Sequence, residues 1–245
     1  MTPGLAEEKT HSLDLVIPCY NPPKGWEHVL AHRYEEICKK LGIVPTLILV
    51  NDGSSGGTVA EFAQQLSKEL TSFHYVEVKT NQGKGNALRT GVELSNSEHT
   101  IYTDVDFPYT VDSIAALYHR LLEGNNVALG TRNDQYYESV PAFRRGLSKS
   151  FRWTLKKLLR LISNDTQCGL KGFDQEGKKV FQKTTINRFL FDLEFVLYCS
   201  RSSQIKLSKV PVQLNQGVTF SKMPVKILLR EGWNFIKILF RTSKK

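Results

Sequence analysis

The chain has 245 residues, of which 40% are hydrophobic and 10% aromatic, which is enough for one globular domain with a sizeable core. Thirty-three lysines and arginines against 24 acidic residues give a formal net charge of +9, which favours an anionic partner: phosphate, nucleic acid or a membrane surface. The polar first 12 residues lack the pattern of a secretory signal, and no apolar run reaches the roughly 20 residues that cross a bilayer. We therefore expect a cytoplasmic chain.

Short apolar runs rich in β-formers alternate with helical segments along the first half of the chain. The predicted strands are 13–21, 46–54, 74–80, 99–106 and 126–132. The predicted helices between them are 26–41, 58–70, 85–94 and 111–122. This alternation predicts an α/β fold with a mixed, mainly parallel sheet and helices on both faces.

Polar side chains follow each predicted strand where it ends. They are Asn21, Asn51, Asp52, Asn81, Asp104, Asp106 and Arg132. Ligands of open α/β sheets bind at the carboxyl ends of the strands, so we expect these side chains to surround one site.

Two aspartates, Asp104 and Asp106, stand one residue apart at the exit of the fourth predicted strand. A D-x-D in this position places two carboxylates close enough to share one divalent cation, which could bridge a diphosphate. The alternative is a solvated turn of the kind that many proteins contain.

The stretch "NQGKGNALRTG" (81–91) places Gly83 and Gly85 around Lys84, just before a predicted helix. This layout lets backbone N–H groups and one ammonium approach an anion or a nucleotide. It matches neither the dinucleotide fingerprint nor a P-loop. Taken singly, each glycine is equally compatible with ordinary turn chemistry.

Five motifs stand in the order that they have in family 2 glycosyltransferases of the GT-A fold, and the chain resembles that family. They are "VIPCYN", "VNDGSSGGT" (50–58), "NQGKGNALRTG" (81–91), "TDVDF" (103–107) and "GTR" (130–132). Three later motifs are similar to the branch of dolichyl-phosphate glucosyltransferases and dolichyl-phosphate mannose synthases. They are "DTQCGLKGF" (165–173), "FLFDLEFV" (189–196) and "KVPVQLNQGVTFSK" (209–222). That branch transfers a sugar from a nucleotide diphosphate sugar to a polyprenyl phosphate.

The resemblance implies a role for each matching position on the donor side. Residues implied to bind the nucleotide sugar are Pro18, Tyr20, Asn21, Asp52, Lys84, Gly85, Asp104 and Lys222. Asp104 and Asp106 would hold Mg²⁺ or Mn²⁺, and Pro108 stands where some relatives have a third ligand. Arg132 would approach phosphate at the sugar end of the site.

On the acceptor side, the resemblance implies that Arg144, Arg145 and Ser148 grip the acceptor phosphate. Asp165 is the first candidate for a carboxylate that faces a sugar, and Asp192 and Glu194 are the alternatives; each could equally be a buried cap or ion-pair partner. The residues expected to carry catalysis are Asp165, Arg132 and Asp106.

We expect a single domain over 1–245 with four parts. They are a flexible segment (1–12), a nucleotide-sugar half (13–132), an acceptor half (133–222) and a C-terminal basic amphipathic helix (223–245). The acceptor half contains a further basic amphipathic helix within 144–160. Such helices suit a peripheral protein on the cytosolic face of a membrane, although packing on the sheet is an equal alternative. A separate membrane subunit is a further possible partner.

The predicted activity is inverting, metal-dependent transfer of a hexose, with UDP-glucose favoured over GDP-mannose, to a polyprenyl phosphate. Two alternatives remain open at this point. One is a family 2 enzyme that acts on a glycan or another lipid, and the other is a non-catalytic protein that binds anionic surfaces. Nucleic acid is not an expected partner, because the aromatic strand motifs of RNA-binding sheets are absent from the sequence.

Overall fold

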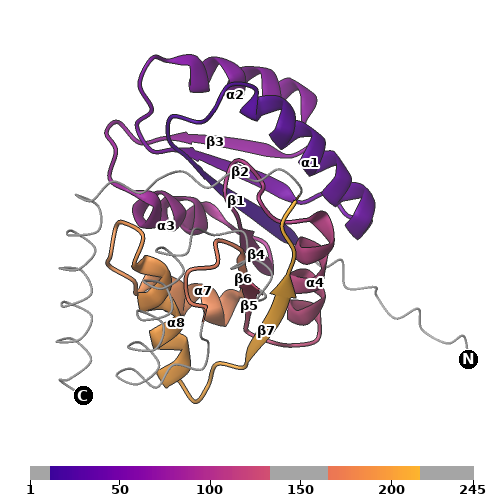
Figure 1. Cartoon of the computed structure of the whole chain (residues 1–245), viewed down its shortest axis with the longest axis vertical. Coiled ribbons are helices and arrows are strands. Elements are labelled where there is room, and N and C mark those ends of the chain that lie inside the picture. The colour runs from indigo at the N-terminus through magenta and orange to yellow at the C-terminus, as the bar shows by residue number, and fades with distance from the viewer. Residues whose placement is uncertain (1–11, 133–164, 216–245) are drawn as a thin grey trace, which may run out of the picture.

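The computed structural model of the chain describes residues 12–132 and 165–215 (Figure 1). The strands are β1 (Leu13–Cys19), β2 (Thr46–Asn51), β3 (Phe73–Glu77), β4 (His99–Tyr102), β5 (Val127–Arg132), β6 (Lys171–Asp174) and β7 (Leu207–Val212). The helices are α1 (Trp26–Leu41), α2 (Thr58–Glu69), α3 (Lys84–Leu94), α4 (Val111–Leu122), α7 (Gln175–Gln182) and α8 (Phe191–Arg201). The five strands and four helices predicted for the first half are confirmed.

The strands form one seven-stranded sheet in the order β3-β2-β1-β4-β6-β5-β7. Of the described strands, β6 alone runs antiparallel to its neighbours β4 and β5. The predicted mainly parallel sheet is confirmed. Strand β6 was not predicted, because its four residues, "KGFD", show neither an apolar run nor alternation.

Two hydrophobic cores cover the two faces of the sheet. Alternate residues of β1 show the division: Leu15 and Ile17 pack under α1, α2 and α4, and Val16 packs on the opposite face with α3, α7 and α8. Because both faces are covered, the central strands are apolar at nearly every position. The helices thus lie on both faces, as the alternation along the sequence predicts (Figure 1).

Local signals in the sequence set several of the helix ends. Thr110 caps α4 by accepting a hydrogen bond from the backbone N–H of Ser113, and Asp174 caps α7 in the same way through Gly177. Gly42 ends α1 in the left-handed region, at φ 66°, where glycine carries no steric cost.

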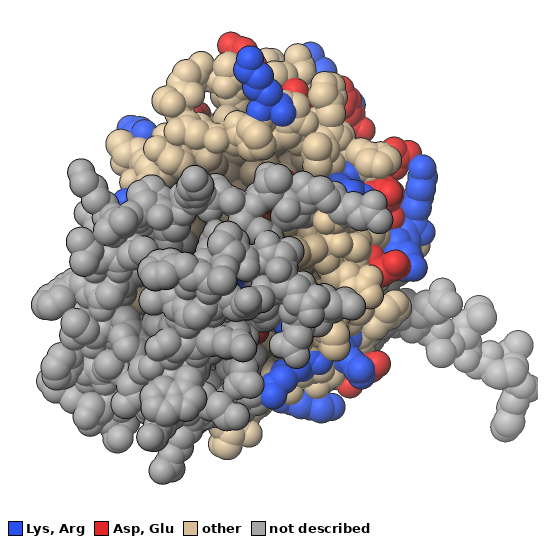
Figure 2. All heavy atoms as spheres, viewed as in Figure 1, with Lys and Arg blue, Asp and Glu red and all other residues tan. Residues whose placement is uncertain are grey.

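The basic excess of the sequence lies outside the described residues. Segment 133–164 holds seven basic and two acidic residues, and segment 216–245 holds seven basic and one acidic. On the described part of the face in Figure 2, basic and acidic side chains are interspersed. Within the described residues, several oppositely charged side chains pair, as Lys40 does with Asp112 at 2.6 Å and Arg120 with Glu123 at 2.8 Å.

Candidate active site

The chain turns sharply at the carboxyl end of β4, where Asp104 and Asp106 follow the buried strand. The N–H of Phe107 donates to the carbonyl of Asp104 at 3.0 Å, and Phe107 adopts a φ of 43°, which is rare outside glycine. The buried Phe107 ring anchors this turn in the core. Both aspartates therefore leave the sheet at the ligand-facing edge that the sequence predicts.

Asn215, just beyond β7, holds this turn from the other side. Its side-chain amide donates to the carbonyls of Phe107 at 2.7 Å and Tyr109 at 3.0 Å, and its backbone N–H donates to the carbonyl of Pro108 at 2.9 Å. Pro108 therefore serves the turn through its carbonyl, and the position offers no side-chain ligand. Sequence reasoning missed Asn215, since an asparagine after a strand gives no signal of its own.

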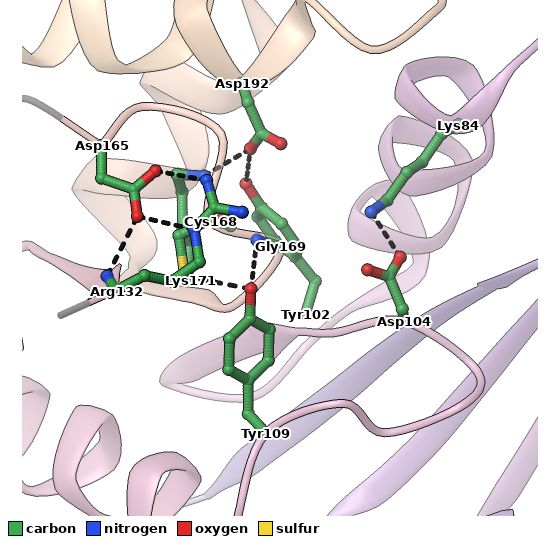
Figure 3. Close-up of polar contacts among 10 residues, drawn as sticks. All are labelled: Lys84, Tyr102, Asp104, Tyr109, Arg132, Asp165, Cys168, Gly169, Lys171 and Asp192. Carbon is green, nitrogen blue, oxygen red and sulfur yellow. Dashed lines mark hydrogen bonds and ion pairs between the residues drawn. The ribbon is translucent and has the colours of Figure 1, made fainter. Parts of the chain in front are cut away.

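Lys84, the first residue of α3, places its ammonium against Oδ1 of Asp104 (Figure 3). Burial alone would lower the pKa of Lys84, but the carboxylates of Asp104 and Asp192 outweigh burial and raise that pKa. Burial, followed by the charge of Asp104, raises the pKa of Asp106. Lys84, Asp104 and Asp106 thus form one electrostatic unit, to which Asp192 adds its charge.

The chemistry of the two aspartates fits a hard divalent cation such as Mg²⁺ or Mn²⁺, which prefers carboxylate oxygens. Within residues 12–132 and 165–215, no group of three or more His, Cys, Asp or Glu side chains gathers as a complete metal site. Two carboxylates fit a cation that takes its other ligands from a diphosphate and water.

The segment that precedes β6 lies directly against the D-x-D. A Cβ added at Gly169 would stand 2.7 Å from Oδ2 of Asp104, so only glycine fits there without displacing the carboxylate. The hydroxyl of Tyr109 accepts a hydrogen bond from the N–H of Gly169 at 3.1 Å and contacts Sγ of Cys168 at 3.3 Å. This close approach brings the second half of the chain onto the site.

Beneath Gly169, a buried network joins β4, β6 and α8 (Figure 3). The ammonium of Lys171, which is 0% exposed, lies 2.6 Å from Oδ1 of Asp192 and donates to the carbonyl of Cys168 at 2.5 Å. The hydroxyl of Tyr102 donates to the same Oδ1 of Asp192 at 2.5 Å. Asp192, a candidate sugar-facing carboxylate, is therefore held by one oxygen within the protein.

Arg132 and Asp165 are brought together, and they bind each other. The guanidinium donates to both carboxylate oxygens, from Nε at 2.8 Å and Nη2 at 2.5 Å, and the backbone N–H of Arg132 adds a bond of 3.0 Å. Burial alone would raise the pKa of Asp165, but the hydrogen bonds and charge of Arg132 outweigh it and lower that pKa. This geometry matches the ion-pair alternative for Asp165, and direct contact of either residue with a sugar or phosphate stays a prediction.

On the nucleotide side, the loops after β1 and β2 are tied together. Asn21, at a φ of 44°, accepts hydrogen bonds through Oδ1 from the N–H of Ser55 at 2.9 Å and from its hydroxyl at 3.2 Å. Tyr20 is 52% exposed beside it, whereas Pro18 is buried within β1. Tyr20 and Asn21 thus lie at the end of β1, and Pro18 lies within the strand. Contact of these residues with a nucleotide sugar stays a prediction.

Asp52 is nearly fully buried, and its carboxylate accepts three protein hydrogen bonds. They come from the N–H groups of Gln82 at 2.9 Å and Gly83 at 2.7 Å, and from the side-chain amide of Asn81 at 2.9 Å. Asp52 therefore holds the loop before α3. Its implied contact with the nucleotide sugar stays a prediction.

The sequence predicts that backbone N–H groups of "NQGKGNALRTG" are available to an anion. This prediction is wrong for the N–H groups of Gly83, Gly85 and Asn86, which donate to protein acceptors. Asp52 takes the N–H of Gly83, and the carbonyl of Asn187 takes those of Gly85 at 2.8 Å and Asn86 at 3.2 Å. Gly85 is needed for packing, because a Cβ there would stand 2.4 Å from the carbonyl of Ile186. The ammonium of Lys84 is what this motif offers to the site.

Comparison with known proteins identifies the family of this chain. The family model described as glycosyl transferase family 2 matches residues 14–185, most of the chain and nearly all of the site. The chain belongs to glycosyl transferase family 2. The predicted family is confirmed, and with it the prediction of a glycosyltransferase.

Among relatives of this family 2 glycosyltransferase is the dolichyl-phosphate beta-glucosyltransferase of Trichomonas vaginalis. The two are 27% identical over 250 residues, which cover 96% of this chain and 75% of the relative. The predicted branch of the family is thereby confirmed.

Solved structures confirm the GT-A fold of the family 2 glycosyltransferase. Mannosyl-3-phosphoglycerate synthase from Rubrobacter xylanophilus superposes with a TM-score of 0.62 at 12% identity, covering 96% of this chain and 74% of that one. A mannosyltransferase from Pyrobaculum calidifontis in complex with GDP-Man and Mn²⁺ gives a TM-score of 0.50 at 14% identity, covering 82% and 56%.

Glu194, the other candidate carboxylate of this family 2 glycosyltransferase, serves the loop between α7 and α8. It accepts hydrogen bonds from the N–H groups of Thr185 at 2.7 Å and Ile186 at 2.9 Å. Arg89 of α3 holds the same loop by donating to the carbonyl of Ile186 at 3.0 Å. Glu194 thus fixes the segment that packs on α3, a role that sequence reasoning did not assign.

Several predicted features of the family 2 glycosyltransferase lie outside the described residues. They are Arg144, Arg145, Ser148, Lys222, the basic helix within 144–160, residues 1–11 of the predicted flexible segment 1–12, and the helix 223–245. None of the helices that the structure describes is long and apolar enough to cross a membrane.

Proposed function

We propose that this chain transfers a hexose from a nucleotide diphosphate sugar, with UDP-glucose the favoured donor, to a polyprenyl phosphate. The observation that carries the proposal is the pair Asp104 and Asp106 at the carboxyl end of β4, with Lys84 beside them, in a family 2 glycosyltransferase. The name of the Trichomonas vaginalis relative, a dolichyl-phosphate beta-glucosyltransferase, supports the acceptor class and the sugar.

On the donor side, Tyr20 and Asn21 bind the nucleoside next to the loop that Asp52 fixes. Asp104 and Asp106 hold Mg²⁺ or Mn²⁺, an assignment supported by their oxygen chemistry and by the Mn²⁺ complex of the Pyrobaculum calidifontis mannosyltransferase. When bound, the metal offsets the negative charge that develops on the departing diphosphate. Lys84 contributes a second positive charge at the same place.

In the reaction, an oxygen of the acceptor phosphate attacks the anomeric carbon as the bond from that carbon to the diphosphate oxygen breaks. The electron pair of the broken bond leaves with the nucleoside diphosphate, and in-line attack inverts the anomeric configuration. The acceptor oxygen is already anionic at neutral pH, so no side chain has to remove a proton. Catalysis then rests on positioning and on charge stabilisation by the protein.

On the acceptor side, Arg144, Arg145 and Ser148 bind the lipid phosphate, and Lys222 reaches the donor diphosphate. Arg132 carries its guanidinium at the end of β5, and Asp165 fixes its direction. The division into a donor half (13–132) and an acceptor half (133–222) of one domain is part of this proposal.

The acceptor requires contact with a bilayer surface, which we assign to the two basic segments of the chain. Segments 133–164 and 216–245 together carry 14 basic and three acidic residues, mixed with apolar ones. Such segments bind anionic headgroups while their apolar side chains enter the interface. We place the protein peripherally on the cytosolic face, alone or with a separate membrane subunit.

The test is product analysis by mass spectrometry with purified protein and Mn²⁺. UDP-glucose and GDP-mannose are compared as donors, and a polyprenyl phosphate competes with an oligosaccharide and a diacylglycerol as acceptors. The proposal predicts hexosylated polyprenyl phosphate, with faster turnover of UDP-glucose. Transfer to the oligosaccharide or the diacylglycerol alone would replace the acceptor class, and no transfer from any donor would overturn the activity.

A further inference from the structure

One oxygen of the D-x-D is already occupied by a cation of the protein itself. Oδ1 of Asp104 pairs with the ammonium of Lys84, and the backbone at Gly169 closes on Oδ2. The two paired side chains are only 19% and 35% exposed, so solvent screens them less than a surface pair. A divalent cation on Asp104 would meet a positive charge at contact distance.

Lys84 is held in this place by its neighbours along the chain. Asp52 binds the N–H of Gly83 at 2.7 Å, and the carbonyl of Asn187 binds the N–H of Gly85 at 2.8 Å. The backbone on both sides of Lys84 is therefore fixed, and only its side chain is free to turn. The fixed backbone therefore keeps the ammonium of Lys84 within reach of Asp104, and only rotation of the side chain can move it.

A second lysine near the site, Lys171, is buried and binds other partners. Lys171 pairs with Asp192 at 2.6 Å and binds the carbonyl of Cys168, and Tyr102 completes the same network. Lys84, by contrast, feels the charges of Asp104, Asp192 and Asp106 together. Among the described side chains, Lys84 is the cation that directly contacts the D-x-D.

We infer that, before the donor arrives, the ammonium of Lys84 takes the place of a divalent cation on Asp104, and that metal binds tightly only together with the diphosphate. The inference rests on the proposed function, because it assigns a diphosphate donor to this site. A diphosphate supplies anionic oxygens that accept the displaced ammonium and complete the coordination of the metal. Lys84 thus couples metal binding to donor binding, and the coupling works equally in both directions.

The experiment measures Mn²⁺ binding by electron paramagnetic resonance, with and without UDP or GDP, and needs no acceptor. In the wild-type protein, nucleotide raises the Mn²⁺ affinity by about ten-fold or more, a typical size for coupling between sites. Lys84→Met raises the affinity for Mn²⁺ alone by about ten-fold, because a charge at contact distance is removed. In that variant the effect of the nucleotide shrinks accordingly.

Three controls sharpen this test. Lys84→Arg keeps the charge and retains the wild-type pattern, and Lys84→Gln repeats Lys84→Met with a polar side chain in case the first variant unfolds. Lys68→Met removes one exposed charge from the far end of α2 and leaves Mn²⁺ binding unchanged. Thermal melting of each variant confirms that it is folded.

Unchanged or weaker binding of Mn²⁺ alone by folded Lys84→Met overturns the inference, and so does equal Mn²⁺ affinity of the wild type with and without nucleotide. Absence of Mn²⁺ binding under every condition also overturns it. The proposed function is judged separately by sugar transfer. Sugar transfer without coupling of Mn²⁺ binding to nucleotide binding would refute this inference alone. Coupling of the two without sugar transfer would refute the proposed acceptor chemistry alone.

Discussion

Two lysine–aspartate pairs lie at this site, and they differ in exposure and in the number of their partners. The Lys84–Asp104 pair is partly exposed, 19% and 35%, at the edge that faces the ligand. The Lys171–Asp192 pair is buried, 0% and 6%, and shares its charge with Tyr102 and a backbone carbonyl. Burial and the number of partners distinguish the two pairs, and under our inference they separate an exchangeable charge from a fixed one.

The largest expected effect follows from removing the two carboxylates of the D-x-D. Asp104→Ala together with Asp106→Ala should lower the rate of sugar transfer by about 10³-fold or more, because the site loses its metal ligands. The rate constant with saturating donor and Mn²⁺ is the measurement. A matched control is Asp112→Ala, which removes an exposed carboxylate from α4 and should leave the rate unchanged. Full activity of the double variant would contradict the metal assignment.

The second prediction concerns the fixed pair. Lys171→Met leaves the charge of Asp192 buried without its ammonium, so the free energy of unfolding should fall by about 3–5 kcal/mol. Lys84→Met should lower it by a smaller amount, because Asp104 is 35% exposed and water can solvate its carboxylate once the ammonium is gone. Chemical denaturation of both variants measures the difference.

Lys171→Met combined with Asp192→Asn should recover part of the loss, because the buried charge is gone and a carboxamide oxygen still accepts from Tyr102. Equal losses for Lys84→Met and Lys171→Met would erase the distinction between the two pairs.

The third prediction concerns Gly169, which lies between the pairs. Gly169→Ala places a Cβ 2.7 Å from Oδ2 of Asp104 and must displace that carboxylate. We expect turnover to fall by about ten-fold, the cost of a small misplacement at a reacting centre. Gly124→Ala is the control: at a φ of 80°, with no atom within 4 Å of the added carbon, it strains the backbone without touching the site. A Gly169→Ala enzyme with wild-type kinetics would refute the close packing.

The smallest effect is a pH dependence of stability from the Arg132–Asp165 pair. The folded pKa of Asp165 is lowered by Arg132, so the pair stabilises the protein above the unfolded aspartate pKa of about 3.9, and this contribution is lost as pH falls through the folded pKa. Asp165→Asn should cost about 1 kcal/mol at neutral pH. The difference in free energy of unfolding between Asp165→Asn and the wild type should vanish in acid, and denaturant titrations from pH 7 downward measure it. A difference that stays constant down to acid pH would rule out the ion pair as its source.

Much of the fold and half of the site could be predicted from the sequence. Strands β1 to β5 are short apolar runs that alternate with longer helices, a pattern that is local in the sequence. The D-x-D follows β4, where the sequence places it. The Lys171–Asp192 network could not be predicted, because its partners are 21 residues apart and nothing local marks Lys171 as buried.

The role of Asp52 also could not be predicted from the sequence alone. The sequence places it correctly at a strand end, but its carboxylate binds N–H groups 30 and 31 residues further along the chain. Those bonds depend on how the loop before α3 returns to β2, which is a tertiary property. Local motifs therefore reveal which residues gather at the site, while packing decides which of them face the ligand.

The central claim, sugar transfer to a lipid phosphate at the D-x-D, is tested most directly by one reaction. Purified wild-type protein is incubated with UDP-glucose, dolichyl phosphate and Mn²⁺, and the lipid is analysed by mass spectrometry and NMR. The account predicts a lipid heavier by one hexose, with the anomeric configuration inverted relative to the donor. An unchanged lipid, with UDP-glucose intact or hydrolysed to free glucose, would contradict it.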